Sequence, residues 1–314
     1  MSIAFLFPGQ GAQTPGFLHR LPDHKPVTAA LEEASHVLGQ DVFELDSEAA
    51  LASTVAVQLT CVIAGVAIAR AIGTRGVEPQ AVAGLSVGAF TAAVVCGALQ
   101  FADALRLVRL RGAMMERVYP HGYGLAAIVG LDERSISTLV EQVSTPEAPV
   151  YLANLNAPTQ FVIAGAEAGL QAALGRARAA GARKAERMAV TVPSHCRLLE
   201  PVAVELERAM ADVVVAEPRI PYVTNRRARV TRDRDVIRDD LARNVMYAVR
   251  WHDATTVLFE LGVRLFIEMP PGHTLTGLAT AAFPDARVVA AEDARLETIA
   301  ILAERERRLD EARY

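Results

Sequence analysis

The stretch Ala83-Gly84-Leu85-Ser86-Val87-Gly88-Ala89-Phe90 decides the fold of this chain. An apolar run at residues 80–83 comes before it and small residues follow, so the sequence predicts a buried strand, a sharp turn and a helix. Gly-x-Ser-x-Gly in this setting is typical of a nucleophile elbow, a strained turn that lifts a serine hydroxyl out of the backbone. The same pattern also occurs in ordinary glycine-rich turns, so the rest of the chain has to decide between the two interpretations.

The helix expected after the turn gives the serine a chemical setting. The backbone N–H of Val87 would lie at a helix N-terminus, which carries a partial positive charge. An N–H in this position can donate to the oxyanion that develops when a nucleophile attacks a carbonyl group. If the turn is a nucleophile elbow, Ser86 is the nucleophile and the Val87 N–H stabilises the oxyanion.

The composition is typical of a packed globular protein and does not indicate nucleic-acid binding. The 314 residues are 52% hydrophobic and 22% charged, and the net charge of -4 provides no broad basic surface. The three cysteines are odd in number and far apart, which argues against a disulfide framework and for a reducing compartment. The sequence opens without a basic region and cleavage site, so we expect a cytoplasmic protein.

The most apolar stretch, residues 55–72, has the length of a helix. It is rich in alanine and is interrupted by polar residues such as Gln58 and Arg70. A membrane-spanning helix needs about 20 residues of stronger apolar character. We therefore expect a buried core helix here and no contact with a membrane.

Apolar runs that suit buried strands alternate with helical patterns through most of the chain. These strands are expected at residues 3–7, 80–83, 218–224, 264–268 and 287–290. The alternation predicts an α/β protein with a mainly parallel sheet and helices on both faces, an α/β-hydrolase-like core. We expect residues 1–123 and 191–314 to form this large domain.

Residues 124–190 follow a pattern of their own. Strands are expected at 125–129, 150–155, 161–164 and 185–190, and helices at 132–143 and 167–180. This β-α-β-β-α-β order is that of a ferredoxin-like unit. The sequence therefore predicts a ferredoxin-like small domain inserted in the large one, with a turn at 154–158 between its middle strands.

A serine nucleophile needs a general base within hydrogen-bond reach, and the chain has seven histidines. Most of them lie in polar surroundings or at expected helix starts. His195 differs, because it lies where the small domain returns the chain to the large one, between Ser194 and Cys196. No second histidine or carboxylate stands at a metal-ligand spacing, so we expect no metal site. His195 is the candidate base.

Five motifs follow one another along the chain. They are Phe7-Pro8-Gly9-Gln10-Gly11, Gly84-Leu85-Ser86-Val87-Gly88, Leu110-Arg111-Gly112, Asn156-Ala157-Pro158 with Ile163-Ala164-Gly165, and Val192-Pro193-Ser194-His195-Cys196. In order and spacing they resemble the malonyl-CoA–acyl carrier protein transacylases over nearly the whole chain. The resemblance implies an acyltransferase that moves a malonyl group from CoA, through a seryl ester, to the thiol of a carrier protein by a ping-pong route.

The resemblance also implies roles for the residues at matching positions. Ser86 would carry the malonyl ester, and His195 would be the general base and then the acid for the leaving thiol. Arg111 would hold the malonyl carboxylate with two parallel hydrogen bonds, which suits a planar guanidinium group. The backbone N–H groups of Gln10 and Val87 would bind the oxyanion.

Two asparagines complete the implied site. Asn244 matches the position whose backbone carbonyl orients the histidine in the family, so no acidic third member is required. Asn156, in the fourth motif, is expected to bind substrate. No bound cofactor is implied, because malonyl-CoA and the prosthetic group of the carrier protein are substrates.

One position departs from the family pattern. The family usually has histidine before the nucleophile, where it lines the malonyl pocket, and this chain has Leu85. The form Gly-Leu-Ser-Val-Gly-Ala-Phe and a shortened region around 47–58 most resemble the epsilon subunit of malonate decarboxylase. We therefore predict transfer to the carrier subunit of malonate decarboxylase, with other decarboxylase subunits as further partners. The alternative is a general malonyl transacylase of fatty-acid synthesis.

Two other functions share the elbow. A serine hydrolase would use water as the acceptor and needs an acidic triad member, for which no candidate stands out, and Arg111 would then have no task. A non-catalytic docking subunit would keep the fold, yet Ser86, Arg111 and His195 are intact. The sequence leaves open the natural carrier, the oligomeric state and the tolerance of methylmalonyl groups.

Overall fold

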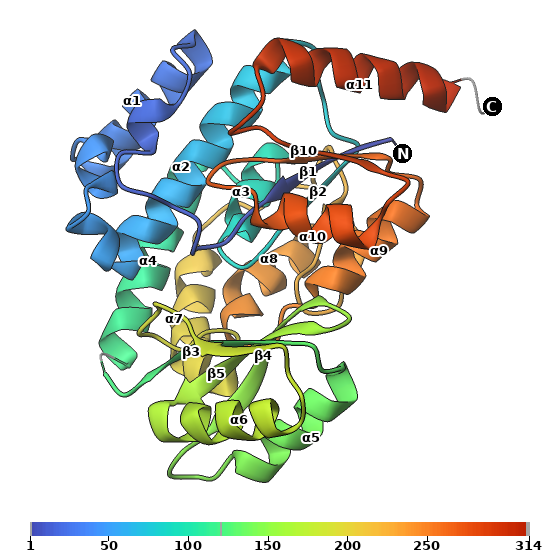
Figure 1. Cartoon of the computed structure of the whole chain (residues 1–314). Helices are drawn as coiled ribbons and strands as arrows, with labels where there is room; N and C mark the ends of the chain where they lie inside the picture. The colour runs from blue at the N-terminus through green and yellow to red at the C-terminus, as the bar shows by residue number, and fades with distance from the viewer. Residues whose placement is uncertain (1, 120, 312–314) are drawn as a thin grey trace.

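The larger part of the molecule is built around a six-stranded sheet, in the order β10-β9-β1-β2-β7-β8. Figure 1 labels β10, β1 and β2 of this sheet in the upper part of the view. The computed structural model describes residues 2–119 and 121–311, so positions 1, 120 and 312–314 of the expected large domain lie outside the described residues. The strands are β1 (Ile3–Phe7), β2 (Ala81–Gly84), β7 (Tyr222–Val223), β8 (Val230–Thr231), β9 (Leu265–Glu268) and β10 (Arg287–Ala290). Neighbours from β10 to β7 are parallel, and β8 is antiparallel to β7. The prediction of a mainly parallel α/β sheet is confirmed.

Strand β7 is shorter than the sequence predicts. The strand expected over residues 218–224 is reduced to two residues, and the sequence does not predict its hairpin partner β8. Pro218 and Pro221 lack the N–H that a strand donates to its neighbour. Regular pairing with β2 therefore begins only at Tyr222.

The two faces of the sheet bury separate cores. In β1, Phe5 and Phe7 point to one face and Ala4 and Leu6 to the other, because successive side chains of a strand alternate. Both faces are covered by helices, which explains why β1 is apolar along its whole length. The first core includes α1 (Lys25–Leu38), α2 (Thr54–Gly73), α3 (Gly88–Val95), α4 (Phe101–Val118), α7 (Glu200–Ala211), α8 (Arg234–Arg243) and α11 (Leu296–Glu311). The second includes α9 (Trp251–Glu260) and α10 (Thr274–Ala282).

Short 3-10 helices lie in the connections between these elements. They are η1 (Leu18–Arg20), η2 (Val42–Asp46), η3 (Ala50–Ala52), η4 (Arg197–Leu199) and η5 (Asn244–Met246). The last two matter for the site, because η4 begins two residues after His195 and η5 begins at Asn244.

Helix α2 is the core helix that the sequence predicts. It begins after Ser53, whose Oγ accepts a hydrogen bond from the N–H of Val55 at 3.2 Å, a normal helix cap. Among the described residues it is the one helix long and apolar enough to cross a membrane, but 89% of its most apolar window is buried inside the structure. The apolar surface of α2 is therefore buried in the first core.

The turn between β2 and α3 is too tightly packed for side chains at its two glycines. A Cβ atom on Gly84 would lie 2.1 Å from the carbonyl carbon of Gly88, and one on Gly88 would lie 2.2 Å from the carbonyl oxygen of Phe7. The same Phe7 oxygen accepts a hydrogen bond from the N–H of Leu85 at 2.9 Å. Helix α3 therefore starts directly against the end of β1, and the glycine spacing makes this possible.

A second sheet, of four antiparallel strands in the order β4-β5-β3-β6, lies in the lower part of Figure 1. Its elements are β3 (Tyr123–Val129), α5 (Glu133–Val143), β4 (Val150–Ala157), β5 (Gln160–Ala166), α6 (Glu167–Ala179) and β6 (Lys184–Arg187). Helices α5 and α6 cover one face of this sheet. The opposite face buries Leu125, Ala153 and Val162 against Cys196, next to the candidate base.

Strand β4 is longer than the sequence predicts, and β6 is shorter. The turn expected at 154–158 is confined to Pro158 and Thr159, and β6 ends at Arg187 instead of continuing to residue 190. The N–H of Leu155 donates to the carbonyl of Val249 at 2.8 Å, and the N–H of Val249 donates to the carbonyl of Ala153 at 2.9 Å. This pairing with a distant segment keeps β4 extended and fixes its asparagines beside the large sheet.

We expect the substitution Gly88→Ala to destabilise the protein and Gly175→Ala to stabilise it. Gly175, in α6, is exposed, and a Cβ atom added there would have no neighbour within 4 Å, so alanine should raise the free energy of unfolding by about 0.5–1 kcal/mol. At Gly88 the collision with Phe7 should lower it by about 2 kcal/mol or more. Urea unfolding of both variants checks this pair, and equal effects of the two substitutions would contradict the packing of the turn.

Candidate active site

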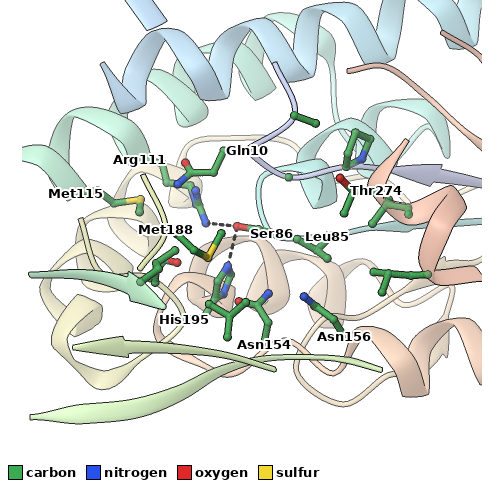
Figure 2. A pocket seen from close by; sticks show the side chains of 18 residues that line it. Gln10, Leu85, Ser86, Arg111, Met115, Asn154, Asn156, Met188, His195 and Thr274 are labelled. Carbon is green, nitrogen blue, oxygen red and sulfur yellow. Dashed lines mark hydrogen bonds between the residues drawn. The ribbon is translucent and has the colours of Figure 1, made fainter. Parts of the chain in front are cut away.

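The hydroxyl group of Ser86 lies between two basic side chains (Figure 2). Its Oγ is 2.7 Å from Nε2 of His195, and it accepts a hydrogen bond from Nη2 of Arg111 at 3.1 Å. Ser86 has a φ of 57°, a left-handed conformation that costs a non-glycine residue about 1–2 kcal/mol. This strained backbone follows β2 and presents the hydroxyl to both basic groups.

A backbone carbonyl group orients His195. The Nδ1 atom lies 2.8 Å from the carbonyl oxygen of Asn244, so Nδ1 carries the proton and Nε2 accepts from the Ser86 hydroxyl. The backbone of His195 is also left-handed, with a φ of 57°, and its N–H donates to the carbonyl of Val245 at 2.7 Å. Within the described part of the chain, no carboxylate contacts this imidazole.

Burial and a neighbouring charge keep His195 neutral. Burial is the larger cause and the positive charge of Arg111 the second, and together they lower the pKa of His195 to about 4. The hydrogen bonds to backbone groups act in the opposite direction and are weaker. A neutral imidazole at neutral pH can take the serine proton, so His195 has the charge state of a general base.

Arg111, on α4, is a buried cation that has no anionic partner among the described residues. Its side chain is 1% exposed, and Nη1 donates to Oε1 of Gln58 at 2.6 Å. Its Nε atom is buried and has no hydrogen-bond partner in the described chain. Burial lowers the pKa of Arg111 to about 10, so the group stays charged at neutral pH. Because an unpaired buried charge is costly, the site favours a ligand that brings a carboxylate.

A cavity of about 120 Å³ opens beside these groups, and Figure 2 shows the side chains around it. Three other residues expected from the sequence, Gln10, Leu85 and Asn156, line this cavity. Leu85 forms an apolar wall with Leu275 and Leu278 of α10. The polar groups that converge on Ser86 therefore face an apolar surface across a small space.

The sequence predicts that the backbone N–H groups of Val87 and Gln10 bind an oxyanion. Val87 is the N-terminal cap of α3, and Gln10 lies in the loop after β1. Neither backbone N–H donates to an acceptor in the described part of the chain. Both groups are therefore free to bind an oxyanion formed next to Ser86.

Sequence reasoning missed three polar residues of the site. Gln58, which holds Arg111, interrupts an apolar helix, and a buried amide in such a helix signals a polar partner. Asn154 lies two residues before Asn156 on β4 and lines the same cavity. Asn225 follows β7, and polar side chains at the carboxyl ends of parallel strands are expected near a ligand site.

Comparison with known proteins identifies relatives that share the whole fold. Residues 4–311 match the family model described as acyl transferase domain. The malonyl CoA-acyl carrier protein transacylase of Escherichia coli K12 is 37% identical over 282 residues, which cover 88% of this chain and 91% of that protein. The solved malonyl CoA-acyl carrier protein transacylase from Coxiella burnetii has a TM-score of 0.92 and 32% identity, and covers 97% of this chain and 98% of its own.

A solved complex adds a partner to these relatives. It contains a malonyl-transacylase bound to a type II polyketide synthase acyl carrier protein. The present chain is similar to that transacylase with a TM-score of 0.90 and 34% identity, over 96% of this chain and 99% of the other.

We expect the reactivity of Ser86 to stay constant as the pH falls to about 5 and to decline around pH 4, because His195 accepts a proton only while neutral and its pKa is lowered to about 4. The measurement is the rate at which a fluorophosphonate probe labels the protein at each pH. In Arg111→Gln the midpoint should move upward, since one of the two causes of the lowered pKa is removed. A wild-type midpoint near the ordinary value of 6.5 would contradict this account.

Proposed function

The chain belongs to the acyl transferase domain family, and we propose that it transfers a malonyl group from malonyl-CoA to the thiol of an acyl carrier protein. The observation that carries this proposal is the buried guanidinium of Arg111, which donates to the Ser86 hydroxyl and has no anionic partner in the described chain. A malonyl thioester has a reactive carbonyl at one end and a carboxylate at the other. It can therefore meet Ser86 and Arg111 at the same time. The names of the relatives support the same assignment.

In the first half of the reaction, the Ser86 Oγ attacks the thioester carbonyl of malonyl-CoA while Nε2 of His195 takes the hydroxyl proton. The negative charge on the carbonyl oxygen is stabilised by the backbone N–H groups of Gln10 and Val87. The tetrahedral intermediate then loses the CoA thiol, which receives the proton from His195. The product is a malonyl ester on Ser86, with its carboxylate held by Arg111.

The second half runs the same steps with a different thiol. His195 takes the proton from the prosthetic-group thiol of the carrier protein, and the sulfur attacks the seryl ester. The ester bond breaks, Ser86 regains its proton from His195, and the malonyl thioester leaves on the carrier. The carbonyl of Asn244 keeps the imidazole in the tautomer that both halves require. Asn156 is proposed to bind the substrate, because it lines the cavity and its buried Oδ1 has no partner in the described chain.

The hydrolase and docking alternatives have less support. A hydrolase of the Ser-His-acid type would place a carboxylate on Nδ1 of His195, where the carbonyl of Asn244 lies. A docking subunit would not need a neutral histidine at hydrogen-bond distance from a strained serine. The docking alternative also leaves the buried charge of Arg111 without a purpose.

The relatives described for this chain favour the general malonyl transacylase over the malonate decarboxylase subunit that the sequence suggests. The relatives named above include malonyl CoA-acyl carrier protein transacylases, and one solved relative is in complex with an acyl carrier protein. The malonate decarboxylase carrier stays a prediction that rests on Leu85 and its neighbours.

We also propose that residues 124–190 act as a small domain that closes one side of the pocket, while 1–123 and 191–314 carry the nucleophile and base.

The proposed function is tested by incubation with isotope-labelled malonyl-CoA followed by intact-mass measurement. We expect one malonyl group on the wild-type protein and none on Ser86→Ala, which removes the nucleophile without creating a large cavity. Addition of an acyl carrier protein should move the label to the carrier. The kcat/KM of malonyl transfer is then measured for a fatty-acid-type carrier and for a malonate decarboxylase carrier, and the higher value identifies the preferred acceptor.

Other outcomes of this experiment would contradict the proposal. Release of malonate from wild-type protein without any carrier would assign a hydrolase. A folded wild-type protein that forms no adduct would support the docking subunit. Full labelling of Ser86→Ala would mean that another residue is the nucleophile.

We expect Arg111 to make the enzyme select acyl groups that carry a free carboxylate. Removing one side of a buried charge pair costs about 2–5 kcal/mol, so Arg111→Ala should lower the kcat/KM for malonyl-CoA by roughly 30-fold or more and affect acetyl-CoA much less. Arg111→Lys, which keeps the charge but loses the two-pronged geometry, should fall in between. The matched control is Arg106→Ala, an exposed arginine on the same helix that pairs with Asp103. Equal losses for both acyl groups in Arg111→Ala would make Arg111 a structural residue.

A further inference from the structure

We propose that Asn225 is a positioning residue that holds the backbone of Ser86 in its left-handed conformation and so sets the reactivity of the serine. Asn225 follows β7 and is 3% exposed. Its Oδ1 accepts a hydrogen bond from the N–H of Ser86 at 2.9 Å, and its Nδ2 donates to the carbonyl of Gly84 at 2.9 Å. The inference rests on the proposed function only in taking Ser86 as the nucleophile.

The side-chain amide of Asn225 takes the place of a peptide group in the sheet. Strands β2 and β7 pair in parallel, and their last regular pair is Ala83 with Val223. Beyond it, the amide bonds to the Gly84 carbonyl and the Ser86 N–H, two groups that a further residue of β7 would bond in a regular ladder. The main chain can therefore leave the sheet at Ser86 without burying unpaired polar groups.

Asn225 is itself fixed by its surroundings. Its backbone N–H donates to Oδ1 of Asp240 at 3.0 Å, and its carbonyl accepts from the N–H of Arg250 at 2.9 Å. Asp240 is 5% exposed, and its other oxygen accepts from the hydroxyl of Tyr222 at 2.7 Å. Every polar group of Asn225 is thus engaged, which leaves its amide a single orientation toward the elbow.

Two features of the site depend on this support. The left-handed φ of 57° places the Ser86 hydroxyl 2.7 Å from Nε2 of His195, and the adjoining peptide group carries the N–H of Val87. Without the amide, the Ser86 N–H and the Gly84 carbonyl lose their partners, and the turn can relax to an unstrained conformation. A shift of about 1 Å at a reacting group can lower a rate by roughly 100-fold. Asn225 is not among the residues that line the cavity, so the loss should appear in rate and not in binding.

The test measures how fast a fluorophosphonate probe labels Ser86. In this reaction Oγ attacks phosphorus, fluoride leaves, and His195 takes the hydroxyl proton, so the rate reports the nucleophile without requiring any acyl carrier. We expect the second-order rate constant to fall by about 10- to 100-fold in Asn225→Ala and in Asn225→Ser, whose hydroxyl is too short to bond both backbone groups. In malonyl transfer, kcat should fall similarly while KM for malonyl-CoA changes by less than about threefold.

A matched control separates positioning from general loss of stability. Thr255, on α9, is 3% exposed, and within the described chain its Oγ1 bonds only to backbone carbonyls of its own helix, including that of Trp251 at 3.1 Å. Thr255→Val also removes a buried hydrogen bond, and it should label at the wild-type rate. Thermal unfolding identifies the temperature below which every variant is folded, and intact mass gives the labelled fraction at the end point.

Slow labelling that reaches the wild-type end point in both Asn225 variants supports the positioning role. A folded Asn225 variant that labels at the wild-type rate would overturn it, and so would an unchanged rate with a reduced end point, which indicates partial unfolding. If the wild-type protein reacts with the probe but forms no malonyl ester, the proposed function fails while the role of Asn225 still stands on the probe rates.

Discussion

A positive charge buried without a negative partner is the constraint on which the pocket depends. Arg111 is 1% exposed, and its guanidinium bonds only the neutral oxygens of Gln58 and Ser86 within the described chain. The positive charge of Arg111 also lowers the pKa of His195, as the second cause besides the burial of the histidine. A carboxylate bound to Arg111 would therefore act twice. It would pair the buried cation, and it would raise the pKa of His195 and so favour proton transfer from Ser86 once the acyl group is in place.

Much of this arrangement could be predicted from the sequence, because local rules and tertiary structure agree at the elbow. The contact between α3 and the end of β1 requires glycines on both sides of Ser86. The local pattern Gly-x-Ser-x-Gly therefore predicts this contact. The alternating elements likewise predict a parallel sheet. The grouping of Ser86, Arg111 and His195, which lie far apart along the chain, followed from five motifs in register and not from periodicity.

The parts that could not be predicted are those in which one segment fixes another at a distance. Strand β4 continues through Asn154 because it pairs with Val249, and no local pattern records such a partner. Gln58 signals a polar partner, but only the fold shows that this partner is Arg111. Asn225 looks like an ordinary polar residue until the fold brings it to the elbow. Strand β7 is short because neighbouring prolines limit its pairing. The apolar character of the segment predicted a longer strand.

The central claim is that the buried guanidinium of Arg111 recognises the free carboxylate of an acyl group esterified to Ser86. A crystal structure of the protein trapped after reaction with malonyl-CoA, without a carrier, tests it most directly. The account predicts an ester bond on Oγ of Ser86 and both carboxylate oxygens within hydrogen-bond distance of the Arg111 guanidinium. A malonyl carboxylate that points away from Arg111, or an acyl group on another residue, would contradict it.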